Sequence, residues 1–343
     1  MRIAAIPGDG VGTEVTAEAL KVLDATGVKV DIEQYDLGGE RYLRTGETLP
    51  ETLIGELAGF DAILLGAVGH PEVPPGILER EILLTLRFEL ELAVNLRPVK
   101  LLAGVESPLA GRGPADIDFT CVRENTEGPY VGAGGNLRVG TPHEIATQES
   151  INTRIGAERC IRFAFEEAAK TERRELMLVH KTNVLTHAGS LWARAFDDVA
   201  AEYQNVATSY GHVDAVCLWM VLDPGRFDVL VTDNLFGDIV TDLGAAISGG
   251  LGYAASGNLN ISGTGPSLYE PVHGSAPDIA GQDKANPVAS ILSLWLALRE
   301  GGESEAAARV LAAVEAVVGE CGAGIGTEVS TSEVGDKIAT AVG

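Results

Sequence analysis

Three segments of the sequence share one order: a short apolar run, a polar or glycine-rich turn, and a stretch with helical periodicity. They cover residues 2–25, 176–196 and 227–247, and a further apolar run at 60–69 leads into a turn. Short apolar runs bounded by turn residues are typical of buried strands, and the stretches that follow have the spacing of amphipathic helices. Strands that alternate with helices predict an α/β protein.

The length and charge of the chain limit its organisation and its partners. A chain of 343 residues favours two domains, and its 45% hydrophobic content is enough for sizeable cores. The net charge is −24, from 49 acidic and 25 basic residues. Such a chain repels nucleic acid and anionic membrane surfaces, so neither is expected as a partner. An anionic small-molecule substrate would need a pocket with its own arginines.

The cysteines and the apolar stretches indicate a cytoplasmic protein. Cys121, Cys160, Cys217 and Cys321 are widely spaced and form no CxxC pair, which argues against a zinc site or a disulfide framework. No signal peptide is visible at the start of the sequence. The longest apolar stretch, residues 288–298, is well short of a membrane span.

The turn "PGDGVG" at residues 7–12 lies between an apolar run and a helical stretch. This is the position of a dinucleotide-binding loop, but the spacing is G-x-G-x-G rather than G-x-G-x-x-G. A tight turn is the simpler interpretation. The sequence contains no Walker A motif.

The segment "VTDNLFGDIVTDLGA", residues 231–245, carries an unusual set of aspartates. Asp233 or Asn234 is a candidate cap for the helix that follows. Asp238 and Asp242 are four residues apart, so they share a helix face and repel each other. No Lys or Arg is nearby in the sequence to neutralise them. Carboxylates in this arrangement suit Mg²⁺ or Mn²⁺; the alternative is an exposed acidic helix face.

Arg87, Arg97 and Arg123 are candidates for binding an anionic substrate, because the guanidinium fork binds carboxylates through two parallel hydrogen bonds. A small dicarboxylate would fit such a set. For each arginine alone, a surface salt bridge is the alternative.

Two further residues are candidates for proton transfer. Lys181 directly follows a predicted strand, where α/β proteins collect active-site groups, and Tyr130 lies in a glycine-rich loop. A solvated lysine and a packing tyrosine are the alternatives. The long loop at residues 269–287 is rich in Gly, Pro, Ser and Ala, and could hold an adenine nucleotide. Residues 118–146 lack helical periodicity and favour a projecting β-hairpin.

Six blocks of the sequence, in this order, resemble those of the β-decarboxylating dehydrogenases that act on (2R)-malates substituted at C3. The blocks are "PGDGVGTEV", "NLRPVKL", "VRENTEGPYVG", "VHKTNVL", "DNLFGDIVTDLGA" and "EPVHGSAPDIAG". The resemblance covers essentially the whole chain. It implies an α/β fold of two domains with a mixed central sheet and a discontinuous first domain. The expected boundaries are 1–94 plus 248–343 for the first domain and 95–247 for the second, with the β-arm at 118–146.

The resemblance also implies a homodimer with shared active sites. Lys181 and Asp214 would come from one subunit, and Asp238 and Asp242 from the other. Asp214, Asp238 and Asp242 would hold Mg²⁺ or Mn²⁺, and Asp214 would also contact the substrate. Arg87, Arg97 and Arg123 would bind its carboxylates, with Lys181 and Tyr130 as the catalytic residues.

The same resemblance places NAD on the "HGSAPDIAG" loop rather than on the "PGDGVG" turn. Asp278 is expected at the adenosine ribose, where a carboxylate binds the diol and repels the 2′-phosphate of NADP. The expected cofactor-binding residues are Asn183, His273, Gly274, Ser275, Ala276, Pro277, Asp278, Ile279 and Asn286.

Leu83 and Leu84 lie one helical turn before Arg87, where family members that use isocitrate have polar residues. Burying an unpaired carboxylate against two leucines is costly, whereas an isopropyl group would pack well there. We therefore expect oxidation of 3-isopropylmalate in leucine biosynthesis. The block "VRENTEGPYVG" is closer to that of relatives using isocitrate, homoisocitrate, tartrate or D-malate than to the form common in isopropylmalate enzymes, so D-malate, tartrate and homoisocitrate stay open as substrates. A catalytically silent regulatory subunit is a further alternative, which the complete set of catalytic residues disfavours.

Overall fold

The computed structural model describes residues 1–343 and is built on one ten-stranded sheet, in the order β2-β1-β3-β12-β11-β4-β5-β10-β8-β9. Strands β11 and β4 are antiparallel to each other and to their outer neighbours, while every other pair is parallel. The predicted α/β fold with a mixed sheet is confirmed. The sheet strands are β1 (Arg2–Gly8), β2 (Asp31–Gln34), β3 (Ala62–Ala67), β4 (Val94–Lys100), β5 (Asp118–Glu124), β8 (Glu175–His180), β9 (Ala207–His212), β10 (Val229–Thr232), β11 (Ala255–Leu259) and β12 (Ser267–Pro271).

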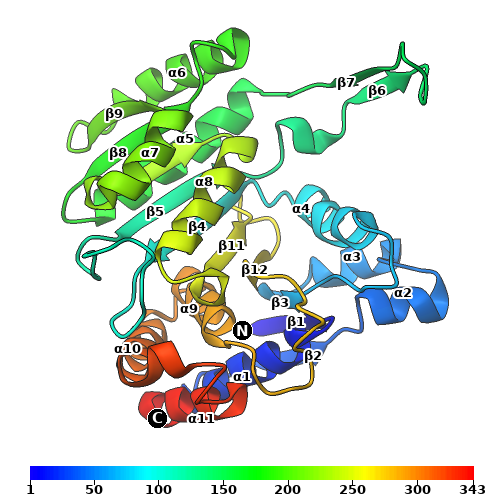
Figure 1. Ribbon diagram of the computed structural model, residues 1–343, viewed down its shortest axis with the longest axis vertical. Coiled ribbons are helices and arrows are strands. Elements are labelled where there is room, and N and C mark those ends of the chain that lie inside the picture. The colour runs from blue at the N-terminus through cyan, green and yellow to red at the C-terminus, as the bar shows by residue number, and fades with distance from the viewer.

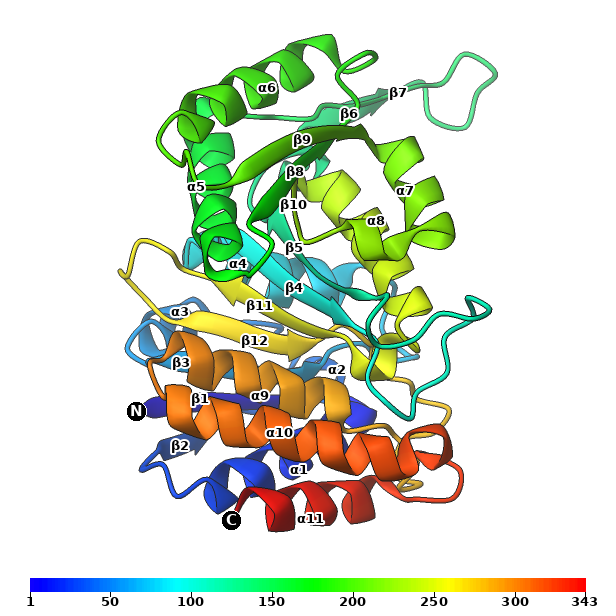
Figure 2. The ribbon, with the colours of Figure 1, turned by 90° about the vertical axis from the view of Figure 1, so that its left-hand side faces the viewer.

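Helices cover both faces of this sheet, and the two termini lie close to its β1 end (Figures 1 and 2). None of the helices has both the length and the apolar content required to span a bilayer. The helices are α1 (Val11–Ala25), α2 (Gly39–Thr45), α3 (Glu51–Leu57), α4 (Thr85–Glu89), α5 (Arg154–Lys170), α6 (Thr186–Ala200), α7 (Val213–Leu222), α8 (Asn234–Ile247), α9 (Val288–Glu300), α10 (Ser304–Cys321) and α11 (Thr331–Val342). A π-helical segment (Glu79–Leu84) leads into α4, and short 3₁₀ turns occur at Pro129–Val131, Pro224–Arg226, Leu251–Tyr253 and Gly322–Gly324.

The two faces of the sheet bury different kinds of core. On one face, a single cluster of 45 buried residues runs across the whole molecule and includes side chains from α1, α5, α6, α9, α10 and α11. On the other face the apolar core is divided into two clusters, one packed under α2–α4 and the other under α7 and α8. The alternation of side chains along each strand explains how one strand serves both faces.

A row of buried polar side chains, which we call the polar seam, lies between the two clusters on that second face. Its members come from neighbouring strands near the centre of the sheet, β4, β5, β11 and β12, or directly follow β5. They are Asn95, Arg97, Arg123, Asn125, Ser256, Asn258 and Glu270, each at most 7% exposed. Buried polar groups need partners, so this seam marks the part of the fold where function is to be sought.

The projecting β-structure is shorter than the sequence indicated. Strand β5, at residues 118–124, belongs to the central sheet and pairs with β4 and β10. Only β6 (Gly134–Leu137) and β7 (Ile145–Gln148) form a separate two-stranded hairpin, which extends away from the body (Figure 1). The glycine- and threonine-rich composition cannot separate a sheet strand from a projecting one, because both have the same local pattern.

Helix α8 begins as predicted and then lies very close to β5. Asp233 caps the helix, with its Oδ1 accepting from the amide of Phe236 at 2.8 Å. Gly237 lies over Arg123, and a Cβ atom added there would be 2.3 Å from Cγ of that arginine. The glycine therefore allows α8 to cover Arg123 at close range.

We expect Gly237→Ala to destabilise the protein. Alanine favours a helix over glycine by about 0.5–1 kcal/mol, but overpacking against Arg123 costs about 1–3 kcal/mol. A matched control is Gly55→Ala in α3, where an added Cβ has no neighbour within 4 Å, so that variant should be slightly more stable. Urea unfolding of both variants measures the difference. Equal effects at the two positions would contradict the close-packing argument.

Candidate active site

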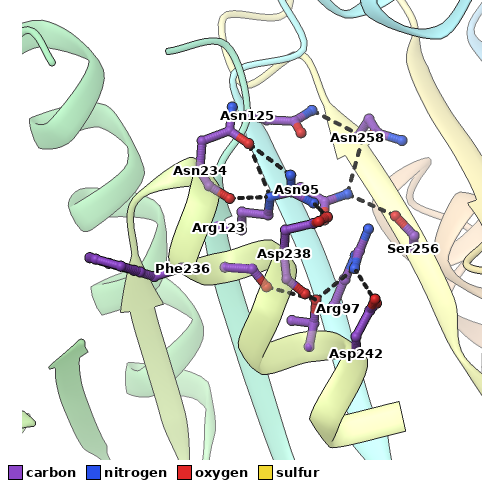
Figure 3. Close-up of polar contacts among 12 residues, drawn as sticks. Asn95, Arg97, Arg123, Asn125, Asn234, Phe236, Asp238, Asp242, Ser256 and Asn258 are labelled. Atoms are coloured by element: carbon purple, nitrogen blue, oxygen red, sulfur yellow. Dashed lines mark hydrogen bonds and ion pairs between the residues drawn. The ribbon is translucent and has the colours of Figure 1, made fainter. Parts of the chain in front are cut away.

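The guanidinium of Arg123 is the most enclosed charged group of the polar seam. Its Nε donates to the carbonyl of Asn234 at 2.9 Å, and its Nη2 donates to Oδ1 of the same residue at 2.8 Å. Its Nη1 donates to Oδ1 of Asp238 at 2.7 Å (Figure 3). Arg123 is only 1% exposed, whereas the side chain of Asp238 is 41% exposed. The first turns of α8 therefore bury the positive charge and leave its carboxylate partner accessible.

Arg97 makes similar contacts with α8, one helical turn after those of Arg123. Its Nη1 donates to the hydroxyl of Thr241 at 2.6 Å and lies 3.8 Å from Oδ1 of Asp242 (Figure 3). Arginines from β4 and β5 thus face Asp238 and Asp242, which corrects the impression from the local sequence that no base is near them. Partial burial and the charge of Asp238 raise the pKa of Asp242, so a further cation would be favourable at this pair.

Arg87 and Arg97 line one cavity of about 240 Å³ together with Leu83, Glu270 and residues 271–274. The Nε atoms of both arginines are buried and have no hydrogen-bond partner. Burial lowers the pKa of both guanidinium groups, that of Arg97 to about 10, which leaves Arg97 charged at neutral pH. The cavity is therefore lined by two guanidinium groups whose donors are not all paired, and guanidinium groups suit a carboxylate.

The two leucines before Arg87 take different positions. Leu83 belongs to the cavity lining beside Arg87, whereas Leu84 does not. Both lie at the end of the π-helical segment and are half-buried. Consecutive residues of a helix point in different directions, so only one of the two leucines lines the cavity beside Arg87.

An amide network connects the polar seam behind the arginines. Nδ2 of Asn95 donates to Oγ of Ser256 at 2.7 Å and to Oδ1 of Asn258 at 3.1 Å. Nδ2 of Asn258 donates to Oε1 of Glu270 at 2.8 Å, and that carboxylate lies 3.6 Å from Nη2 of Arg87. The network thus ends on the carboxylate that faces Arg87. This network was not predicted from the sequence, although Asn95 and Arg97 have the two-residue spacing of one strand face.

The block that departs from the isopropylmalate form has a local structural role. The buried carboxylate of Glu124 accepts from the amides of Thr126 at 2.9 Å and Glu127 at 2.8 Å, which closes a turn after β5. Asn125 donates to Oδ1 of Asn258 at 3.0 Å and so extends the amide network. These side chains stabilise the turn and the seam rather than line the cavity beside Leu83.

Tyr130 lies at the edge of this arrangement, in the 3₁₀ turn after β5. Its ring centroid is 5.3 Å from the guanidinium carbon of Arg123. Partial burial raises the pKa of the Tyr130 hydroxyl above its usual value, so the group keeps its proton at neutral pH and can act as a donor.

Lys181 and Asp214 form a separate pair within the chain. Nζ of Lys181 is 2.5 Å from Oδ1 of Asp214, and this contact lowers the pKa of the carboxyl. No cluster of three or more His, Cys, Asp or Glu side chains suited to a metal ion occurs within one chain. Asp214 therefore does not complete the pair on α8 in the single chain.

The expected nucleotide loop folds against the "PGDGVG" turn. The amide of Val11 donates to the carbonyl of Ser275 at 2.8 Å. His273 Nε2 is buried without a partner, and burial lowers the pKa of this imidazole. Ala276 has a positive φ of 38°, and a Cβ added at Gly274 would meet nothing within 4 Å. The loop thus presents backbone with free space beside it.

The remaining expected nucleotide contacts lie in three places. Asp278 and Pro277 are exposed on the loop, and Ile279 packs against a small cluster with Val11. Asn286 accepts from the amide of Val288 at 3.0 Å, at the start of α9. Asn183 is exposed in the turn after β8, beyond Lys181.

Comparison with known proteins places the chain among relatives that it matches over nearly its full length. The profile of the isocitrate/isopropylmalate dehydrogenase family matches residues 2–338. The 3-isopropylmalate dehydrogenase of Nocardia farcinica is 60% identical over 342 residues, with 100% of both chains covered, and that of Corynebacterium glutamicum is 57% identical over 343 residues, covering 100% of this chain and 99% of its own. Among solved structures, isocitrate dehydrogenase from Methylococcus capsulatus superposes with a TM-score of 0.90 at 35% identity, with 99% of both chains covered.

A β-decarboxylating dehydrogenase from Thermococcus kodakarensis superposes with a TM-score of 0.81 at 36% identity, covering 99% of this chain and 96% of its own. Sequence and structure are thus matched over nearly the full length in each comparison. The chain belongs to the isocitrate/isopropylmalate dehydrogenase family.

Proposed function

We propose that this chain is an NAD-dependent enzyme that oxidises and decarboxylates 3-isopropylmalate in leucine biosynthesis. The observation that carries this proposal is the position of Leu83 beside Arg87 in one cavity. An arginine suits a carboxylate of the substrate and a leucine suits its alkyl group. Full-length identity of 57–60% to curated 3-isopropylmalate dehydrogenases supports the same substrate.

In this proposal the arginines bind and orient the carboxylates of the malate. Arg87 and Arg97 have buried Nε donors without partners, and Arg123 holds its position through Asn234. Arg87 and Arg97 line the cavity, and their positive charges in a mostly enclosed site attract an anion far more strongly than they would in water. They also overcome the repulsion expected from a protein with a net charge of −24.

Asp238 and Asp242 are proposed to hold Mg²⁺ or Mn²⁺. Their oxygens are hard donors on one helix face, and the pKa of Asp242 is raised by burial and by its neighbour, which fits a site that gains from a divalent cation. A bound divalent cation would polarise the oxygens of the substrate and favour loss of carbon dioxide. Asp214 of the partner subunit would supply the third carboxylate.

NAD is proposed to lie along the loop from His273 to Ile279, with Asn286 and Asn183 as further contacts. The partnerless His273 Nε2 and the open space at Gly274 fit a bound nucleotide. Asp278 is exposed, as binding of a ribose diol requires. Bound NAD would supply the hydride acceptor.

Proton transfer is proposed for Lys181 and Tyr130. Lys181 of the partner subunit would take the proton from the substrate hydroxyl, and Tyr130 would donate one at C3 after decarboxylation. The raised pKa of Tyr130 keeps its proton available.

We further propose a homodimer formed through α7 and α8. The ten residues of α7 include one charged side chain, Asp214, yet Leu218 is 55% and Leu222 is 60% exposed. On α8, Leu235 and Ile239 are also exposed. Contiguous exposed apolar side chains mark interfaces. These helices carry the three proposed metal ligands, so pairing them with a second copy would bring the acidic groups of two chains together.

The proposed domains are 1–94 plus 248–343, and 95–247. The two apolar clusters on the second face of the sheet support this division, because each is built from residues of one proposed domain. We retain a cytoplasmic location as the expectation from cysteine spacing.

The substrate proposal is tested by NADH formation with 3-isopropylmalate and D-malate, compared in wild type and Leu83→Ser. Wild type should prefer 3-isopropylmalate. The variant should lose about 1–3 kcal/mol of transition-state binding for that substrate, because the alkyl contact is removed, and little for D-malate. Leu43→Ser, at an exposed position on α2, is the control and should change neither value. If the wild type prefers D-malate, the proposed substrate is wrong and the protein is a D-malate-oxidising enzyme of the same family.

Asp242→Asn should weaken Mn²⁺ binding strongly, because it removes a charged oxygen ligand while keeping the size of the side chain. Direct titration of Mn²⁺, followed by electron paramagnetic resonance, measures this without turnover. Asp24→Asn, at an exposed position near the end of α1, should bind as wild type does. Unchanged Mn²⁺ affinity in Asp242→Asn would remove this residue from the ligand set.

Leu218→Asp should shift the protein toward monomers, because it places a charge in the proposed apolar interface. Sedimentation velocity at several concentrations measures the shift, and NADH formation should fall with it. Leu43→Asp, equally polar but on α2, is expected to leave the association unchanged. The dimer proposal fails if the wild type sediments as a monomer.

A further inference from the structure

The proposed base, Lys181, lies just beyond the end of strand β8. The strand ends at His180, and the chain then turns, with the carbonyl of Lys181 accepting from the amides of Val184 at 3.0 Å and Leu185 at 2.9 Å. Beyond a strand end, the sheet ladder no longer holds the backbone. The place of the lysine then depends on contacts made by the residues on either side of it.

One side chain reaches the backbone on both sides of Lys181. Tyr210 lies on β9, which is parallel to β8 at the edge of the sheet. Its hydroxyl donates to the carbonyl of His180 at 3.1 Å and accepts from the amide of Thr182 at 3.1 Å. It is also 2.9 Å from Oγ1 of Thr182 and 2.9 Å from Nδ1 of His212. A phenol has one donor and two acceptor positions, one fewer than these four neighbours, so each position of this hydroxyl has a partner.

The same turn is packed closely against α6. A Cβ atom added at Gly189 would lie 2.6 Å from Cα of Thr182, so the helix touches the backbone of the turn. The turn after β8 is therefore held by a hydroxyl on β9 and by close packing from α6. The hydroxyl is the polar part of this support, and it is removable without changing the packing.

Tyr210 also connects the two strands that carry the pair described above. Lys181 follows β8, and Asp214 lies in the first turn of α7, directly after β9. Nζ of Lys181 is 2.5 Å from Oδ1 of Asp214. Fixing the end of β8 against β9 thus fixes the proposed base relative to a proposed metal ligand.

We propose that Tyr210 is a positioning residue for proton transfer: its hydroxyl holds the backbone on both sides of Lys181 so that the amine keeps its reactive place. This inference rests on the proposed function, because it assigns a role within that reaction. Proton transfer needs heavy atoms about 2.6–3.2 Å apart, and a misplacement of about 1 Å costs up to about 100-fold in rate. A hydroxyl that touches no reacting atom can therefore control kcat through the backbone.

The test is Tyr210→Phe in the full-length protein, assayed with 3-isopropylmalate and NAD. We expect kcat to fall about 10-fold or more, with KM for both ligands changed by less than about 2-fold, because the arginines and the nucleotide loop are untouched. Tyr35→Phe is the matched control. Its hydroxyl also makes a hydrogen bond, to Glu56 at 2.9 Å, but on the other half of the sheet, so kcat should stay unchanged.

Hydrogen exchange of a peptide covering residues 179–185 gives a second readout that needs no substrate. Tyr210→Phe frees the Thr182 amide, so this peptide should exchange faster than in wild type, while Tyr35→Phe should leave it unchanged. If wild type turns over neither malate, the proposed function fails and the exchange result alone decides whether the hydroxyl holds this turn. Unchanged exchange, unchanged kcat in an active enzyme, or equal losses in Tyr210→Phe and Tyr35→Phe would each overturn the inference.

Discussion

The burial of the Arg123 guanidinium beneath α8 is the interaction on which the rest of the site depends. An uncompensated charge in this place would cost several kcal/mol, so the first turns of α8 must supply oxygen atoms at fixed positions. Asn234 and Asp238 supply them. Because Gly237 has no side chain to meet Arg123, α8 can lie close enough for Asn234 and Asp238 to contact the guanidinium. The same close approach of α8 places Asp242 near Arg97, at 3.8 Å.

The second determinant is the divided core. One face of the sheet is apolar from end to end, which joins the two halves of the molecule. On the other face, the side chains buried along the polar seam are amides, arginines, a serine and a carboxylate rather than apolar groups. Buried polar networks are stable only when their members are paired. Four buried atoms in and beside the seam have no partner: Oδ1 of Asn95, Oδ1 of Asn125, and the Nε atoms of Arg87 and Arg97. The two Nε atoms belong to charged side chains that line the cavity, and such exceptions make these arginines candidates for contact with a ligand.

Part of the acidic surplus of the chain lies on α7 and α8, beside exposed apolar side chains. These helices combine exposed apolar side chains with the carboxylates of Asp214, Asp238 and Asp242. Hydrophobic burial between two copies would hold like charges near one another, and a divalent cation would offset their repulsion. Association and metal binding would then depend on each other. Association would bring the carboxylates together, and the bound cation would offset the repulsion between them.

The sequence by itself determined the strand–helix units, the placing of Asp238 and Asp242 on one helix face, the Asp233 cap and the family, because these depend on residues close along the chain or on whole blocks. Only the tertiary structure decided which charges meet. Arg97 contacts Asp242 and Arg123 contacts Asp238, and each pair is more than 100 residues apart in sequence. The two-residue period of a strand predicts which side chains share a face of the sheet, but it does not predict which helix packs on that face. Only the tertiary structure likewise showed that Leu83, and not Leu84, lines the cavity with Arg87. Pairings of this range depend on strand order and helix approach, which are properties of the packed chain.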